Sequence, residues 1–327
     1  MKKVLLLGGT GALGIYLTKE LLDMGYKVDV VAKDQPVTKH PNLTFYLQNA
    51  KDKEFQRTLL QNRYDAIVDF LIYSTMEEYD EYYPNYLANT HHYLYLSSYR
   101  VYGDAKGLVT EETPRLIDLP LPSDFVREDE YSIYKAEGED RLKNSGKKNW
   151  TILRPAISFS QRRYQLTVLE ARHFYHRMLK GKVVPLPECA LDVQGTLSWA
   201  GDFGKTVARL ILNPYAYGEA YTVGTAEHHS WREIAEMYGR IAGLKYQAVS
   251  ADAFFSFRGD DALHRQQLFY DRCFNRALDN SKLLNATGLK QSDFMPTEKG
   301  LAYELGRQNP DEIPFDIQLD QKMDAIL

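Results

Sequence analysis

The strongest constraint on the fold of this chain is a glycine turn directly after its first apolar segment. The apolar run Val4 to Leu7 leads into Gly8, Gly11 and Gly14, and an apolar-periodic segment begins at Ile15. A strand that turns straight into a helix leaves backbone N–H groups pointing at one spot, and glycines let a pyrophosphate approach them closely. The pattern therefore predicts a βα unit that binds a dinucleotide.

The segments that follow extend this unit into an alternation of strands and helices. Helical patterns such as the one over Met76 to Ala88 separate successive apolar runs, as crossover connections do. We therefore expect an α/β fold with a doubly wound parallel sheet, a Rossmann fold. The predicted strands after the first are Lys27 to Ala32, Leu43 to Leu47, Asp65 to Tyr73, Tyr93 to Ser97 and Trp150 to Leu153.

The pattern also predicts how the chain is divided between two lobes. Residues 1–156 form the dinucleotide-binding Rossmann domain, and the irregular pattern after Pro155 indicates a smaller, interleaved C-terminal substrate lobe over 157–195 and 226–327. The helical stretch Gly201 to Leu212 and the apolar run Tyr221 to Gly224 predict that residues 196–225 return to the Rossmann sheet. A chain of 327 residues with 44% hydrophobic residues can bury a core in both lobes.

A tyrosine and a lysine at helical spacing form a second chemical motif. Tyr131 and Lys135 share one face of a predicted helix, so the ammonium group favours the ionised form of the phenol. Ser98, at the end of a predicted strand, adds a hydroxyl donor. This set can move the proton of an alcohol while a nicotinamide exchanges a hydride with it. The chain has 24 tyrosines, so the spacing also arises by chance, and its position between two predicted strands favours the catalytic interpretation.

Taken together, the motifs resemble those of the extended branch of the short-chain dehydrogenase/reductase superfamily, which contains the sugar-nucleotide epimerases and dehydratases. The resemblance rests on the G-x-x-G-x-x-G turn, the Y-x-x-x-K pair, the run Ser97 to Gly103, which matches S-S-x-x-V-Y-G, and Leu153-Arg154-Pro155. The C-terminal half of the chain matches only loosely.

The resemblance implies roles for the motif residues. Tyr131 would be the catalytic acid/base, Lys135 would orient the nicotinamide ribose, and Ser98 would bond the reacting oxygen. A nucleotide-linked sugar would be the substrate and a homodimer the assembly. Four tyrosines of the helix Met76 to Ala88 are either core residues or part of that dimer interface; they are Tyr79, Tyr82, Tyr83 and Tyr86.

The same resemblance predicts which residues hold the cofactor. The second predicted strand ends at Ala32, and the following Lys33 favours the 2′-phosphate of NADP, although Asp34 leaves NAD open. Asn49 aligns with the family's adenine contact. The complete predicted set is Gly8, Thr10, Gly11, Ala12, Leu13, Gly14, Lys33, Asn49, Leu71, Tyr131 and Lys135.

Two departures from the family pattern bear on the reaction. Dehydratases of the family carry Asp-Glu directly before V-Y-G, where this chain has Tyr99 and Arg100, so 4,6-dehydration is disfavoured and epimerisation or carbonyl reduction remains. Asp69 to Tyr73 replaces a His-Leu-Ala-Ala run with bulkier residues. These departures keep an alternative open, a binding module for RNA or a regulatory partner, as in the similar chloroplast stem-loop-binding proteins.

A basic segment within the predicted substrate lobe suits a phosphate-bearing substrate. Gln161 to Lys182 holds six Arg and Lys residues, and arginine forks match phosphate oxygens, although a solvated amphipathic helix would look the same. Arg162 and Arg163 follow the sixth predicted strand and so lie near the ligand crevice. The predicted substrate contacts are Ser98, Tyr99, Arg100, Arg162 and Arg163.

Composition narrows the remaining classes. A net charge of −4 argues against a dedicated nucleic-acid binder, while a local basic patch stays compatible with it. Glu170, His173 and His176 lack the further ligands of a metal centre, so we predict no metal. Cys189 and Cys273 form no C-x-x-C, and no segment has membrane-spanning length, so we expect free thiols in a cytoplasmic protein.

Overall fold

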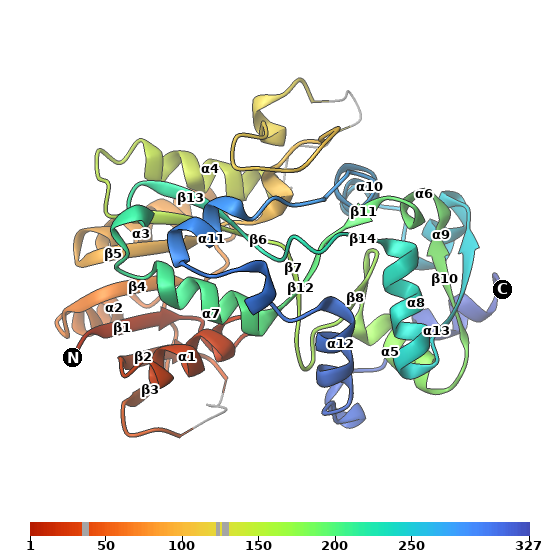
Figure 1. The fold of residues 1–327 in the computed structure, drawn as a ribbon, viewed down its shortest axis with the longest axis horizontal. Helices are drawn as coiled ribbons and strands as arrows, with labels where there is room; N and C mark the ends of the chain where they lie inside the picture. The colour runs from red at the N-terminus through yellow and green to blue at the C-terminus, as the bar shows by residue number, and fades with distance from the viewer. Residues whose placement is uncertain (35–38, 122–124, 126–130) are drawn as a thin grey trace.

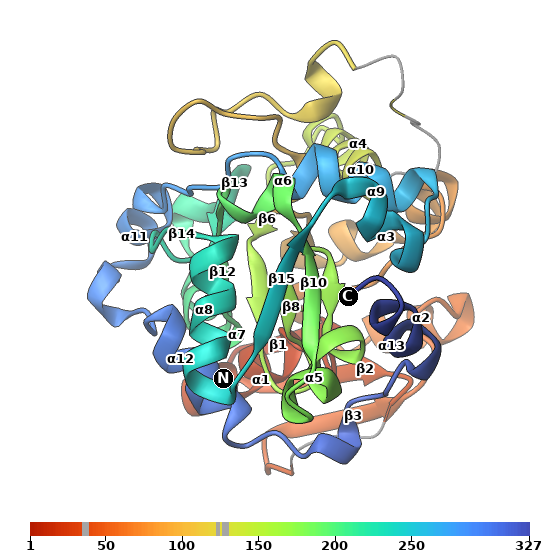
Figure 2. The same ribbon diagram turned by 90° about the vertical axis from the view of Figure 1, so that its right-hand side faces the viewer.

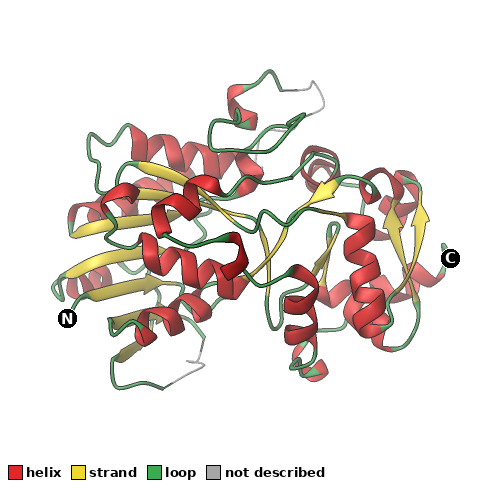
Figure 3. Ribbon diagram, viewed as in Figure 1, coloured by secondary structure: helices red, strands yellow, loops and turns green. Residues whose placement is uncertain are grey.

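The computed structural model describes residues 1–34, 39–121, 125 and 131–327. Its centre is a seven-stranded sheet in the order β13-β6-β5-β4-β1-β2-β3 (Figure 1; strands in yellow in Figure 3). Every neighbouring pair is parallel, which confirms the predicted Rossmann fold. The strands are β1 (Lys3–Leu7), β2 (Lys27–Ala32), β3 (Leu43–Leu47), β4 (Tyr64–Asp69), β5 (Thr90–Leu96), β6 (Trp150–Pro155) and β13 (Glu219–Val223).

Helices cover both faces of this sheet because each strand buries both of its faces. Along β1, Val4 and Leu6 pack on one side, and Leu5 and Leu7 pack on the other. The first side holds α1 (Gly14–Asp23), α7 (Ala200–Leu210) and α11 (Ser281–Thr287). The second side holds α2 (Lys53–Leu60), α3 (Met76–Ala88) and α4 (Tyr131–Lys143).

The strand order reverses between β1 and β4, and this reversal places the ligand crevice at the carboxyl ends of these strands. One predicted boundary was wrong there, because β4 ends at Asp69 and not at Tyr73. The Asp69 carboxylate accepts a hydrogen bond from the backbone N–H of Leu71 at 2.9 Å, which turns the chain across the strand ends.

The second lobe is built from helices and pairs of short strands. Figure 2 shows β10 and β15 side by side, and they form a parallel pair. The strands are β7 (Ile157–Phe159), β8 (Gln165–Leu166), β9 (Leu169–Glu170), β10 (Val183–Pro187), β11 (Gln194–Gly195), β12 (Leu197–Trp199), β14 (His229–Ser230) and β15 (Lys245–Val249). The helices are α5 (Ala171–Leu179), α6 (Glu188–Leu191), α8 (Trp231–Ala242), α9 (Ala251–Arg258), α10 (Ala262–Gln267), α12 (Thr297–Leu305) and α13 (Ile317–Asp324).

Short helical turns complete the description. They are η1 (Tyr99–Val101), η2 (Leu116–Asp118), η3 (Pro214–Ala216), η5 (Gln291–Asp293) and η6 (Pro310–Glu312), with one π-helical segment, η4 (Leu268–Arg272). Among the described residues, no helix has the length and apolar character needed to cross a membrane.

The two lobes interleave along the chain. α7 packs against α1, and β13 pairs with β6 at the edge of the main sheet, so residues 200–223 return to the Rossmann layer. The structure adds a second return within the stretch assigned to the substrate lobe, because α11 packs on α7 and β13 (Figure 1). Leu283 and Phe294 are buried in that core, which explains why this segment leaves the lobe.

Three of the four tyrosines of α3 face inward. Tyr79, Tyr82 and Tyr86 are buried against the sheet, and Tyr83 stacks on Tyr79 with ring centroids 4.5 Å apart. Of the two interpretations of these side chains, the core interpretation therefore holds for the three buried ones.

Candidate active site

The glycine turn after β1 has the backbone geometry of an anion site. Gly8 has a φ of +77°, which L side chains rarely adopt. A Cβ on Gly14 would lie 2.5 Å from the carbonyl oxygen of Gly9, so only glycine lets α1 begin this close to the turn. Leu13, at the N-cap of α1, supplies no side-chain cap. The N–H of Ile15 already bonds the Gly11 carbonyl at 3.2 Å, and the glycine turn before it fits a pyrophosphate.

A cavity of about 520 Å³ connects this turn to the strand ends and to the second lobe. The sequence predicted about half of the residues that line it, and these come from four separate parts of the chain. The predicted residues that line the cavity are Gly8, Gly11, Ala12, Leu13, Gly14, Ser98, Tyr99, Arg100, Tyr131, Lys135 and Arg163.

Tyr131 and Lys135 lie together on the wall of this cavity at the start of α4. The ammonium nitrogen of Lys135 is 5.7 Å from the centroid of the Tyr131 ring and donates a hydrogen bond to the carbonyl of Leu96 at 2.7 Å. Lys135 is buried, whereas Tyr131 is 38% exposed. Ser98 caps η1, because its Oγ accepts a hydrogen bond from the N–H of Arg100 at 3.2 Å. The three groups thus share one cavity with the glycine turn.

Five predicted site residues lie outside this cavity. Leu71 packs behind Gly8 in the core, Lys33 lies exposed after β2, and Asn49 accepts a hydrogen bond from the N–H of Lys51. Thr10 lines a different cavity of about 560 Å³ between α1, β3 and α12, which contains none of Tyr131, Lys135 and Ser98.

The fifth, Arg162, is separated from its neighbour Arg163 by the backbone. Arg162 has a φ of +66°, and Ser160 and Arg163 exchange backbone hydrogen bonds at 3.0 Å, which makes a tight turn. As a result, Arg163 lines the main cavity. Arg162 pairs with Glu312 at 2.7 Å and lines an adjoining cavity of about 420 Å³ that Arg163 also borders.

The bulky segment after β4 borders the cavity next to the glycine turn. Phe70 and Ile72 both line it. Asp69 holds this segment in place, because its carboxylate accepts hydrogen bonds from the hydroxyls of Tyr73 at 2.8 Å and Tyr93 at 2.6 Å. Burial raises the pKa of Asp69 although these donors oppose the shift.

A group of arginines surrounds one buried carboxylate on the lobe side of the cavity. Asp271 forms ion pairs with Arg100 and Arg276, each at 3.3 Å, and with Arg272. Arg272 lines the cavity and donates hydrogen bonds to the carbonyl of Thr167 at 2.8 Å and the hydroxyl of Tyr99 at 3.2 Å. Burial lowers the pKa of Arg276 to about 10. Among the residues that the structure describes, three guanidinium groups thus gather around the carboxylate of Asp271.

Sequence reasoning missed Asp271, Arg272 and Arg276. They fall in a stretch without a family motif, and no local pattern relates them to a strand end far away in the chain. The sequence nonetheless contains a signal. Asp271 and Arg272 interrupt the aromatic and apolar run Leu268 to Phe274, and Arg276 follows it. Burial of this run would require its charged residues to pair with one another.

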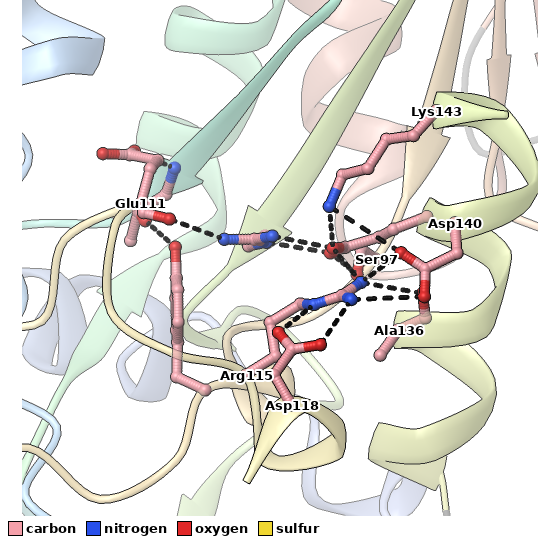
Figure 4. A network of polar contacts seen from close by, with 11 residues as sticks. Ser97, Glu111, Arg115, Asp118, Ala136, Asp140 and Lys143 are labelled. Atoms are coloured by element: carbon pink, nitrogen blue, oxygen red, sulfur yellow. Dashed lines mark hydrogen bonds and ion pairs between the residues drawn. The ribbon is translucent and has the colours of Figure 1, made fainter.

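A buried ion network lies next to Ser98 at one end of the site (Figure 4). Glu139 accepts two hydrogen bonds from Arg154, at 2.8 and 2.7 Å, and one from the Ser97 hydroxyl at 2.7 Å. Arg115 approaches it at 3.4 Å. Burial alone would raise the pKa of Glu139, but Arg154 and Ser97 outweigh burial and the pKa is lowered. The network ties α4 to the ends of β5 and β6, next to Ser98.

Comparison with solved structures shows that several nucleotide-sugar enzymes share this fold. A dTDP-glucose 4,6-dehydratase from Bacillus anthracis, solved with NAD, superimposes with a TM-score of 0.69 at 19% identity, covering 94% of this chain and 96% of that one. The UDP-glucose 4-epimerase of Thermus thermophilus, solved with NAD, gives 0.66 at 20% identity over 93% and 98%. A UDP-glucuronic acid 4-epimerase mutant from Bacillus cereus, in complex with NAD and a fluorinated UDP-sugar, gives 0.67 at 16% identity over 93% and 98%.

The chain is also similar in sequence to one curated protein. The chloroplast stem-loop binding protein of 41 kDa b from Arabidopsis thaliana is 23% identical over 260 residues, which cover 74% of this chain. The match covers 64% of that protein, so the chain spans less than two thirds of its length. The family model for the NAD dependent epimerase/dehydratase family matches residues 4–224. The chain therefore belongs to the NAD dependent epimerase/dehydratase family.

Proposed function

We propose that this protein is an NAD(P)-dependent epimerase or carbonyl reductase that acts on a nucleotide-linked sugar or a related polyol. The observation that carries the proposal is the meeting of Tyr131, Lys135 and Ser98 with the glycine turn in one cavity. Such a set performs proton transfer at an alcohol or a carbonyl next to a bound nicotinamide.

Each side chain has a distinct task in this proposal. A nicotinamide cofactor bound at the glycine turn supplies the acceptor and donor of hydride. Tyr131 removes the proton of the substrate alcohol, and Lys135, held by the Leu96 carbonyl, stabilises the phenolate. Ser98 accepts a hydrogen bond from a backbone N–H, so its own O–H is available to bond the reacting oxygen.

The surroundings of Tyr99 and Arg100 support epimerisation or reduction over dehydration. The Tyr99 ring is buried and its hydroxyl accepts a hydrogen bond from Arg272, while Arg100 pairs with Asp271. Elimination of water needs a proton donor and an acceptor at these positions, and neither side chain is a carboxyl group.

The arginines indicate the charge of the substrate. Arg163 and Arg272 both line the cavity, and within the described chain the guanidinium of Arg163 has no ion pair. We assign these two residues to the phosphate groups of a nucleotide-linked sugar, since guanidinium forks bind phosphate oxygens in pairs.

The test of the proposal is the conversion of Tyr131 to Phe in the purified protein. We expect Tyr131→Phe to lower turnover of a UDP-sugar by at least 100-fold, on the order of a lost acid/base group, while bound cofactor released on denaturation stays at the wild-type level. Tyr134→Phe is the matched control, because Tyr134 lies on the same helix with glycine, not lysine, four residues later. Equal turnover by the wild type and Tyr131→Phe would remove Tyr131 from the mechanism.

The similarity to the stem-loop binding protein favours RNA binding as a second candidate. The basic segment weakens this candidate, since its cations are largely paired: Arg172 with Glu170 at 3.3 Å, and Arg177 and Lys182 with Asp320 at 2.7 and 2.8 Å. An RNA-binding function predicts affinity for a stem-loop RNA that falls steeply with salt and is unaffected by Tyr131→Phe. Salt-insensitive or undetectable binding would exclude it.

A further inference from the structure

The fold brings together the two cysteines of the chain, which are far apart in sequence. The Sγ atoms of Cys189 and Cys273 are 3.6 Å apart although 84 residues separate them along the chain. Cys189 lies on α6, and Cys273 directly follows the π-helical segment η4. The sequence predicted two free thiols, and the structure has two free thiols in mutual contact.

The two thiols have different surroundings. Cys189 is exposed, whereas Cys273 is half-buried and donates a weak hydrogen bond to the Cys189 sulfur. This hydrogen bond lowers the pKa of Cys189 to about 7, and the interaction with Cys189 together with burial raises the pKa of Cys273. Cys189 is therefore the accessible nucleophile, and Cys273 is positioned to resolve an adduct formed on it.

The segment directly before Cys273 also lines the cavity. Gln267 and Arg272 contribute to the cavity wall at the two ends of η4, and the N–H of Cys273 bonds the carbonyl of Leu268 at 2.8 Å. A disulfide requires sulfur atoms about 2.05 Å apart, so bond formation must bring the two Sγ atoms closer by roughly 1.5 Å. Arg272 is covalently adjacent to Cys273 and donates a hydrogen bond to the Thr167 carbonyl, so any displacement of Cys273 on oxidation would be transmitted to the cavity wall.

We propose that Cys189 and Cys273 are a thiol–disulfide modification site coupled to the part of the cavity wall that contains Arg272. The oxidant is a low-molecular-weight disulfide. The Cys189 thiolate attacks one sulfur of it and releases the first small thiol, and the Cys273 sulfur then attacks Cys189 and releases the second. The protons of the two cysteines end on the two small thiols. The two cysteines together lose two electrons, and the small disulfide gains them. This modification site goes beyond the function proposed above.

The experiment equilibrates the full-length protein with glutathione at increasing ratios of disulfide to thiol, followed by alkylation and peptide mass analysis. In the wild type we expect both thiols to disappear together, with the peptides of Cys189 and Cys273 linked within one chain. Cys273→Ser should carry one glutathione on Cys189. Cys189→Ser, the matched control, should leave Cys273 unmodified. A wild type that keeps both thiols, or that carries separate glutathiones on the two cysteines, would overturn the proposal.

Two further readouts test the coupling without any measurement of turnover, so their failure is distinct from a failure of the proposed function. Oxidation should raise the melting temperature of the wild type by about 3–6 °C, because the bond closes a long loop of the unfolded chain. Amide exchange should change in residues 267–276 and in the Gln165 to Leu169 segment that Arg272 contacts. Exchange that changes only around Cys189, or in no segment, would refute the link to the cavity.

Discussion

Replacement of Glu139 by Gln should destabilise the protein strongly although it keeps the side-chain shape. Glu139 is fully buried, and within the described chain it is the only carboxylate paired with Arg154, which is 3% exposed. The variant leaves that guanidinium buried without a counter-charge, which costs about 3–5 kcal/mol. For 327 residues the unfolding entropy is roughly 0.7 kcal/mol per degree, so the expected loss is about 4–7 °C in melting temperature.

The assay is thermal unfolding followed by circular dichroism, with Glu298→Gln as the matched control. Glu298 forms the same two-bond pair with Arg240, at 2.7 and 3.1 Å, but both side chains are exposed, so its loss should leave the melting temperature nearly unchanged. Equal losses in the two variants, or no loss in Glu139→Gln, would refute the role of burial in this network.

The destabilisation caused by Glu139→Gln should also depend on pH. The folded-state pKa of Glu139 lies below its ordinary value of 4.5, so its contribution to stability is present above that pH and is lost as pH falls toward the folded pKa. The difference in unfolding free energy between wild type and Glu139→Gln should therefore be constant from pH 7 to pH 5 and shrink below pH 4.5. A difference that grows on acidification would contradict the lowered pKa.

Three further predictions concern the binding of cofactor and substrate. Gly14→Ala should abolish NAD⁺ binding measured by calorimetry, because its Cβ would collide with the Gly9 carbonyl, whereas Gly107→Ala, where a Cβ meets nothing within 4 Å, should bind as the wild type does. Lys33→Ala should weaken the binding of NADP⁺ about 10-fold and leave the affinity for NAD⁺ unchanged, since one charged contact to a phosphate is worth about 1.4 kcal/mol. Equal effects on the two cofactors would reject Lys33 as a contact of the 2′-phosphate. Arg163→Met should raise the KM for a UDP-sugar about 10-fold or more with little change in cofactor affinity, and an unchanged KM would remove Arg163 from the substrate site.

The sequence was sufficient for those parts of the fold that local patterns determine. The glycine turn, the strand Lys27–Ala32 and the helix Met76–Ala88 each carry a signal within one element, and the structure confirms them. Apolar periodicity did not reveal that the chain turns at Asp69, because the apolar residues Phe70 to Ile72 continue the strand pattern while a side-chain hydrogen bond ends the strand.

The site was harder to predict where it depends on backbone direction and on contacts distant in sequence. Arg162 and Arg163 are equivalent in sequence, and only the positive φ of Arg162 decides which one reaches the main cavity. The pairing of Asp271 with Arg100 joins residues from the two lobes. The contact of Cys189 with Cys273 joins two parts of the second lobe that are far apart in sequence. Such contacts follow from the packing of the lobes, which no local pattern encodes.

The central claim is that Tyr131 faces a nicotinamide bound over the glycine turn, and a crystal structure of the protein with NAD⁺ tests it most directly. The account predicts the pyrophosphate at Gly11 to Gly14 and the nicotinamide ring beside Tyr131, with space for a substrate carbon about 3–3.5 Å from both the ring and the phenol oxygen. A nicotinamide excluded by Phe70 and Ile72, or turned away from Tyr131, would contradict it.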